Sequence, residues 1–324
     1  MTRLTILYVR MLRYRVAVML WMFMLLGAAF HGGLTPGLVW AALALASSYV
    51  AATALNDVAD RDLDRVNHPR DAGRPLVSGT ATEADLLLLN KLASVLALLA
   101  ALPLGWVGVL LVVCSLAIGR VYSSSPALLS YRTYLAPVVL AFAYVAVPYG
   151  LGVSAAAGLA LGSDVVFCLA LMALFLARIN LKDFRDRRGD ALYGRPTLLL
   201  RFGKDVTCAV SVAALVAGNV LLFVAVEAPP ELALVLETFF VAIAWALHTL
   251  WRAPEGRAEQ IAIGIGAKSG NGLLLTVLAW LVLTAAGAPP ADRLLFTLLL
   301  ASASTFAFAA LVRSPERAVI GYKG

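Results

Sequence analysis

Long apolar runs separated by short polar segments make up most of the chain. The runs that predict helices lie at about 16–31, 36–55, 85–101, 104–121, 133–150, 163–180, 206–226, 232–250, 271–287 and 293–311. A helix needs about 20 apolar residues to cross a bilayer, and these runs are close to that length. The pattern therefore predicts an all-α fold, a polytopic transmembrane helical bundle of nine or ten spans. The number stays open because Gly-Ala-Pro-Pro at 287–290 would also suit a bend in one longer helix.

The composition supports a membrane protein. Hydrophobic residues make up 61% of the chain and charged residues 14%, whereas a soluble domain carries about a quarter charged residues. The net charge of +7 would also suit a nucleic-acid-binding protein. Its basic residues instead flank the apolar runs, as the positive-inside rule describes, so we expect membrane lipid and no nucleic acid as a partner. The three cysteines lie singly in apolar stretches, which argues against a disulfide scaffold and against a zinc site.

The basic residues also predict the orientation in the membrane. Residues 3–15 alternate arginine with apolar residues and predict a short helix at the interface. If this segment lies inside and the chain crosses at every run, nearly all Lys and Arg residues fall on one side. We therefore expect a multi-pass protein of the cell inner membrane, with both termini and the polar segments near residues 56–84 and 178–204 on the cytoplasmic side.

Two aspartate triplets share one spacing, three residues and then four. They are Asp57, Asp60 and Asp64 after the second run, and Asp183, Asp186 and Asp190 after the sixth. An Arg-Pro pair follows each triplet, at Arg74 and at Arg195. The repeat predicts a weak internal duplication, about 16–150 and 163–311, within a single membrane-embedded domain of residues 1–324.

The triplet spacing predicts a site for metal ions and phosphate. Positions i, i+3 and i+7 lie on one face of a helix and extend about 10 Å along its axis. That is too long for one ion. Mg²⁺ takes one or two carboxylates and completes its shell with water and phosphate oxygens. Two opposed acidic faces therefore suit a diphosphate held through two Mg²⁺ ions. A merely solvated charged segment is the alternative, and the duplication of the spacing argues against it.

The residues around the triplets resemble a known family. Residues 56–64 read NDxxDxxxD and are followed by Arg74-Pro75 and Gly79, and residues 182–190 read KDxxDxxGD. Together they resemble the two signatures of the UbiA superfamily of intramembrane prenyltransferases, from the first span to about residue 290. The resemblance implies a helical bundle whose two acidic cytoplasmic loops lie over a central cavity. It also implies Mg²⁺-dependent transfer of a prenyl group, through an allylic cation, from a prenyl diphosphate to a small aromatic or lipid acceptor.

The resemblance also implies roles for individual residues. The expected metal ligands are Asn56, Asp57, Asp60 and Asp64 for one ion, and Asp183, Asp186 and Asp190 for the other. Among these, the residues most directly implied in catalysis are Asp60, Asp64, Asp186 and Asp190. The expected substrate-binding residues are Arg65, Arg74 and Lys182 at the diphosphate and Arg132 near the acceptor, with an ordinary cytoplasmic anchor as the alternative for Arg132. Arg178-Ile179-Asn180 stands where many members that use aromatic acids carry a tyrosine, which argues against 4-hydroxybenzoate as the acceptor.

Other functions remain open at this stage. A membrane terpene cyclase of the same superfamily would share both motifs and cyclise the cation. A cation transporter would use the aspartates as ion ligands, although transport sites favour the bilayer midplane over one-sided loops. His68 is expected to serve loop structure, and residues 268–272 are expected to form a flexible turn before a helix. The Ala, Leu and Val residues of the spans do not identify the acceptor or the prenyl chain length, and neither oligomeric state nor protein partners can be inferred.

Overall fold

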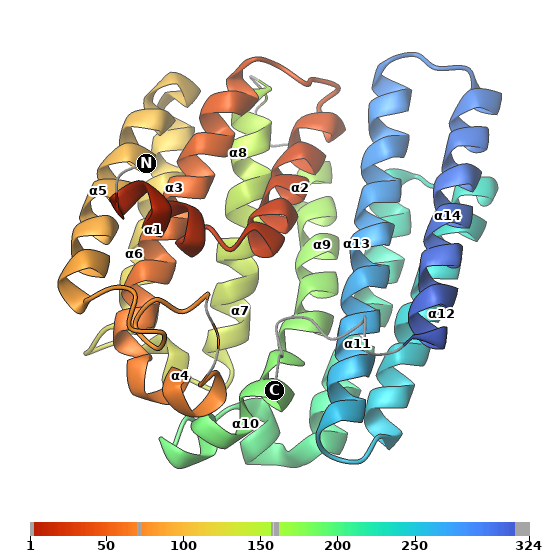
Figure 1. Ribbon diagram of the computed structural model, residues 1–324. Coiled ribbons are helices and arrows are strands. Elements are labelled where there is room, and N and C mark those ends of the chain that lie inside the picture. The colour runs from red at the N-terminus through yellow and green to blue at the C-terminus, as the bar shows by residue number, and fades with distance from the viewer. Residues whose placement is uncertain (1–2, 70, 72, 157, 159–161, 315–324) are drawn as a thin grey trace. The chain divides into compact units, whose positions relative to one another are not determined.

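The computed structural model describes residues 3–314 except 70, 72, 157 and 159–161, and every regular element in that part of the chain is helical (Figure 1). In chain order the α-helices are α1 Arg3–Met11, α2 Tyr14–Phe30, α3 Gly37–Ala59, α4 Arg61–Asn67, α5 Glu83–Ala101, α6 Gly105–Ser123, α7 Leu135–Ala141, α8 Val147–Ala155, α9 Gly162–Ile179, α10 Lys182–Leu192, α11 Leu198–Val226, α12 Pro230–Arg252, α13 Arg257–Ala285 and α14 Pro290–Arg313. A π-helical segment, Phe142–Ala146, joins α7 to α8. The all-α prediction is confirmed.

Most of the helices are long and apolar enough to cross a membrane. Among the described residues, 8 helical segments meet this test, or 9 if the bent pair of α1 and α2 counts as one span. One of the segments, Glu83–Ser123, has 41 residues. It contains α5 and α6, of 19 residues each, on either side of the 3₁₀ turn Leu102–Leu104. If α5 and α6 count as separate spans, the described residues contain 9 or 10 candidate spans, the number predicted from the apolar runs.

The contacts divide the described residues into two compact units. Unit 1 contains residues 3–158 and 186–197, and unit 2 contains residues 162–185 and 198–314. In unit 1, α3 packs against α5 and α6, and α2 packs against α8. In unit 2, α11 packs against α9, and α13 packs against α12 and α14.

Helix α5 is apolar on two opposite faces. Thr82 and Asp85 form a capping box that starts the helix, because each side chain bonds the other residue's backbone N–H. One face of α5, with Leu86, Leu89 and Ala93, is buried. The opposite stripe is exposed and equally apolar: Leu88, Leu92, Val95 and Leu99. A long helix that exposes such an apolar stripe opposite its buried face is stable in an apolar surrounding, which here is lipid.

Two glycines allow α2 and α8 to approach closely. A Cβ on Gly27 would overlap the carbonyl of Tyr149, and a Cβ on Gly152 would overlap the carbonyl of Met24. Small residues at such crossings are typical of membrane helices, where close packing replaces the hydrophobic effect as the source of association.

Several predicted boundaries are wrong in unit 2. Residues 268–272 were expected to form a flexible turn, but they lie inside α13, which begins 14 residues before the predicted start at 271. Helix α11 begins at Leu198 and contains one non-helical residue, Gly203, at φ 80°. Helix α13 begins with polar residues, and α11 has Arg201, Lys204 and Asp205 in its first two turns, so a hydropathy pattern does not mark where either helix begins. The open question at 287–290 is resolved, because α13 ends at Ala285 and α14 begins at Pro290.

Candidate active site

The first aspartate triplet lies at a break between two helices. Asp57 is in the last turn of α3, Asp64 is in α4, and Asp60 lies between the helices at φ −97° and ψ 13°. The expectation of one continuous helical face is therefore wrong for this triplet. The break turns α4 away from the α3 axis, and the side chains of Asp57 and Asp64 are 2% and 5% exposed.

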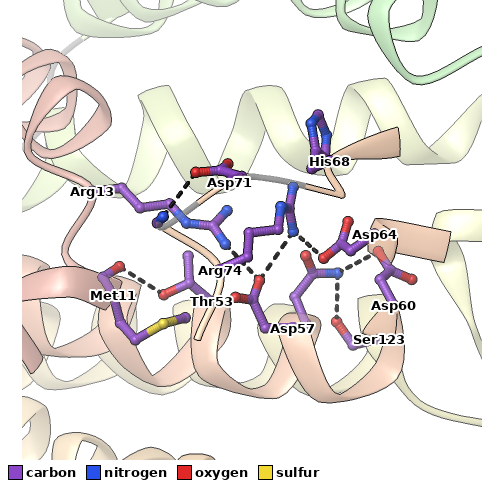
Figure 2. A network of polar contacts seen from close by, with 12 residues as sticks. Met11, Arg13, Thr53, Asp57, Asp60, Asp64, His68, Asp71, Arg74 and Ser123 are labelled. Atoms are coloured by element: carbon purple, nitrogen blue, oxygen red, sulfur yellow. Dashed lines mark hydrogen bonds and ion pairs between the residues drawn. The ribbon is translucent and has the colours of Figure 1, made fainter. Parts of the chain in front are cut away.

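Two arginines from distant parts of unit 1 reach the buried carboxylates. Arg13, at the bend between α1 and α2, donates to Asp57 Oδ1 at 2.5 Å. Arg74 donates to the same oxygen at 3.2 Å and, through the same nitrogen Nη1, also to Asp64 Oδ2. Figure 2 shows Arg74 between the two aspartates, with Arg13 approaching Asp57 from the other side. Asp57 Oδ2 is buried and has no hydrogen-bond partner in the part of the chain that the structure describes.

Asp60 connects the triplet to the second acidic segment. Its Oδ2 accepts from Asn56 Nδ2 at 3.0 Å, and its Oδ1 accepts from Arg195 Nη2 at 2.5 Å. Arg195 also places Nη1 at 3.7 Å from Asp190 Oδ1, and its guanidinium lies 5.2 Å from the ring centroid of Tyr131. Arg195 therefore links a carboxylate of each triplet.

The second triplet lies on one continuous helix, α10, as its spacing predicts. Within unit 1, Asp186 Oδ1 is 3.1 Å from His68 Nε2, and the backbone N–H of Gly189 donates to Asn67 Oδ1 at 2.6 Å. Asp190 is 2% exposed. The end of α4 and the later part of α10 are thus in direct contact, and the carboxylates of both triplets meet in unit 1.

The carboxylate of Asp64 is buried beside two other carboxylates and Arg74. Burial raises the pKa of Asp64 to about 7, and the neighbouring Asp57 and Asp60 carboxylates add to this rise, while Arg74 opposes it. The pKa of Arg195 is raised as well. Burial alone would lower it, but the neighbouring carboxylates of Asp60 and Asp190 have the larger combined effect. Further positive charge is therefore favourable beside Asp64.

The donor set fits Mg²⁺ shared with a phosphate ligand. In the described part of the chain, no three His, Cys, Asp or Glu side chains converge to hold one metal ion by themselves. Mg²⁺ does not require such a cage, because it binds through one or two carboxylates and takes its remaining oxygens from water and substrate. The buried, unbonded Asp57 Oδ2 and the paired carboxylates of Asp60 and Asp64 are oxygen donors of this kind.

The predicted substrate-binding residues are not all brought together. Arg74 lies in the cluster, with a side chain 13% exposed. Arg65 bonds Asp62 Oδ1 at 3.0 Å on the surface, with a side chain 55% exposed. Arg132 is exposed, at the end of the 3₁₀ turn Leu129–Tyr131. Lys182 and the buried Asp183 form the first turn of α10 and belong to unit 2.

Four residues that contact the two acidic segments were not predicted as site residues: Arg13, Asn67, His68 and Arg195. Arg195 was visible only as the second Arg-Pro of the repeat, and His68 was expected to serve loop structure. Residue spacing could not identify Arg13 or Asn67. Arg13 lies 44 positions from Asp57, and Asn67 lies 122 positions from Gly189. Only folding brings them to the carboxylates.

Comparison with known proteins decides the identity. The UbiA prenyltransferase family matches residues 16–267, a range that includes both triplets. The chain belongs to the UbiA prenyltransferase family. This prenyltransferase is 28% identical over 211 residues to the bacteriochlorophyll synthase 33 kDa chain of Rhodobacter capsulatus, covering 63% of this chain and 68% of that one.

Solved structures have the same fold. A UbiA homologue from Archaeoglobus fulgidus bound to GPP and Mg²⁺ is 16% identical, with a TM-score of 0.65 over 85% of this chain and 99% of that one. The apo UbiA homologue from Aeropyrum pernix K1 is 21% identical, with a TM-score of 0.58 over 83% and 96% of the two chains. The protein is therefore an integral membrane enzyme, a prenyltransferase with the fold of these homologues.

Proposed function

We propose that this enzyme ionises a prenyl diphosphate at the clustered aspartates and transfers the prenyl group to an aromatic or lipophilic acceptor within the membrane. The observation that carries the proposal is the convergence in unit 1 of carboxylates from both triplets with Arg74 and Arg195. A homologous structure that binds GPP and Mg²⁺ supports the choice of donor and metal.

The residues divide between metal and diphosphate. Asn56, Asp60 and Asp64, with Asp57 beside them, would hold one Mg²⁺, and Asp186 and Asp190, supported by Asp183, would hold the other. When bound, Mg²⁺ neutralises the charge that grows on the diphosphate as the allylic C–O bond breaks.

The cluster's arginines would add fixed positive charge. Arg74 is the foremost of them, because it is held in a buried, preorganised position where electrostatic stabilisation is strongest. Lys182 and Arg65 remain candidates for contacts at the rim, and Arg132 remains a candidate near the acceptor.

The membrane environment serves the chemistry by excluding water. The cation left by ionisation reacts with any nearby nucleophile, and an apolar surrounding leaves the acceptor as the partner. We further propose that residues 1–324 act as one domain, and that the inner membrane holds the enzyme with both termini and the acidic segments facing the cytoplasm. Cysteine labelling of Ser314→Cys and Gly287→Cys from each side of the membrane tests this orientation.

The proposal is tested by pyrophosphate release from purified protein in detergent. Geranyl, farnesyl and geranylgeranyl diphosphates are offered with Mg²⁺, with and without a panel of aromatic and lipid acceptors, and with EDTA as the metal-free control. Acceptor-dependent release that stops with EDTA is expected. Release without acceptor, together with a hydrocarbon product, would identify a cyclase. A folded protein that releases no pyrophosphate with any pair would contradict the proposal.

A further inference from the structure

Two consecutive residues at the end of α4 join the first acidic segment to α10. Asn67 is the last residue of α4, and His68 follows it. Asn67 Oδ1 accepts from the backbone N–H of Gly189 at 2.6 Å, and His68 Nε2 lies 3.1 Å from Asp186 Oδ1. Both side chains are buried, 7% and 8% exposed. We call this pair of contacts the α4–α10 latch.

Position 189 has no space for a side chain. A Cβ built on Gly189 would lie 2.6 Å from Asn67 Nδ2 and 2.7 Å from its Cγ and Oδ1. The amide of Asn67 therefore occupies the volume that a side chain at 189 would need. Glycine at this position is explained by the close approach of Asn67, because Gly189 lies within the helix and needs no unusual φ.

The latch contacts lie beside the carboxylates of both triplets. Asn67 follows Asp64 by three residues on α4, and Gly189 directly precedes Asp190 on α10. His68 contacts Asp186 itself. Loss of a group that hydrogen-bonds to a metal ligand and orients it weakens metal binding by about 10- to 100-fold. A displacement of about 1 Å between reacting groups is also sufficient to slow a reaction about 100-fold.

We propose that Asn67 and His68 are positioning residues that set the separation between the two acidic segments, so that a single metal-bound diphosphate engages both. The inference rests on the proposed function, because it assigns a role in holding that substrate. Asn67 acts through the backbone of α10, and His68 acts through the orientation of Asp186. Neither residue needs to touch the substrate.

The test is a double-mutant cycle on the full chain in detergent. The variants are Asn67→Ala, Gly189→Ala and the two combined. The first readout is the Kd, measured by calorimetry with Mg²⁺ present, for a thio analogue of geranyl diphosphate whose allylic bond does not break. The second is the Mg²⁺ concentration that gives half-maximal pyrophosphate release, and the third is Tm. Binding of the analogue does not depend on turnover.

Each single change is expected to weaken binding of the analogue and to raise the half-saturating Mg²⁺ concentration by about 10-fold or more. The double variant is expected to remain within about 3-fold of Asn67→Ala, because removal of the Asn side chain makes room for the new methyl group. If Gly189→Ala does not fold, Asn67→Ala and the double variant still test the proposal.

Two matched controls separate positioning from general loss of structure. Asn90→Ala also removes a hydrogen bond between an asparagine side-chain amide and the backbone, because Asn90 Nδ2 donates to the Ala51 carbonyl at 2.8 Å. Gly266→Ala adds a methyl to another helical glycine, where the Cβ meets only Ala246 at an ordinary 3.5 Å. Both are expected to leave the Kd and the Mg²⁺ response unchanged.

His68 is tested by removal and conservative replacement. His68→Ala is expected to raise the half-saturating Mg²⁺ concentration, and His68→Gln, whose amide places a donor near the Nε2 position, is expected to restore it. Latch variants that lower Tm but leave the Kd and Mg²⁺ response at wild-type values would overturn the positioning role. Full additivity in the double variant would also overturn it. A wild-type protein that neither binds the analogue nor releases pyrophosphate would overturn the proposed function, and the latch with it.

Discussion

The two acidic segments share one spacing but differ in backbone and in the way their charges are paired. The first is broken at Asp60, between α3 and α4, whereas the second is the unbroken helix α10. Arg74 contacts Asp57 and Asp64, both in its own segment, through one nitrogen. Arg195 uses two nitrogens and links Asp190 to Asp60 of the other segment. Arg74 thus pairs two carboxylates of the segment it follows, whereas Arg195 pairs one carboxylate from each segment.

The largest effect is expected at Asp64. Asp64→Asn removes a buried carboxylate proposed to bind metal and should lower the rate of pyrophosphate release by about 10³-fold, the upper range for loss of one preorganised group that stabilises charge in a transition state. Asp62→Asn, on the exposed face of the same short helix, is the control and should retain the wild-type rate. Comparable rates for the two variants would remove Asp64 from the metal site.

The next effect concerns stability. Asp57→Ala leaves the guanidiniums of Arg13 and Arg74 without their shared carboxylate, and breaking a buried ion pair costs about 3–5 kcal/mol. A large fall in detergent Tm is expected, measured without Mg²⁺ or substrate. An unchanged Tm would show that the first segment is not held together by these two pairs.

The comparison of the two arginines makes a sharper prediction. Lysine carries one ammonium group and arginine a planar fork. Arg74→Lys is therefore expected to retain activity within about 3-fold, because one nitrogen serves both carboxylates. Arg195→Lys should lose about 30-fold, or about 2 kcal/mol, because no single nitrogen serves Asp60 and Asp190 together. The rate of pyrophosphate release measures both, and equal losses would contradict the different pairing.

The smallest effects are expected at the exposed arginines. Arg65→Ala and Arg132→Ala should change the rate of pyrophosphate release by at most about 3-fold, because exposed ion pairs and exposed charges contribute little. The KM for the acceptor is the second measurement for Arg132→Ala. A rise of 10-fold or more in that KM would assign Arg132 to the acceptor site. A loss of 10-fold or more in the rate of pyrophosphate release by Arg65→Ala would show that Arg65 binds the diphosphate.

The sequence by itself determined the class of fold and the family. Apolar runs of about 20 residues admit only membrane-spanning helices, because an unbonded backbone is too costly in lipid. The two triplets, with their Arg-Pro pairs, pointed to a prenyltransferase, and the family match confirmed it. The shared spacing predicted one continuous helix for each triplet, which is correct for the second on α10 and wrong for the first at Asp60.

Only the tertiary structure decided which charges meet. The helix break at Asp60, the reach of Arg13 to Asp57, and the bond between Asn67 and Gly189 have no signature in residue spacing. Arg13 and Asp57 are 44 positions apart, and Asn67 and Gly189 are 122 positions apart, so both bonds depend on the packing of helices that are distant in sequence. Spacing determines which side chains share a helical face, whereas buried ion pairs require partners that only close packing brings within hydrogen-bonding distance.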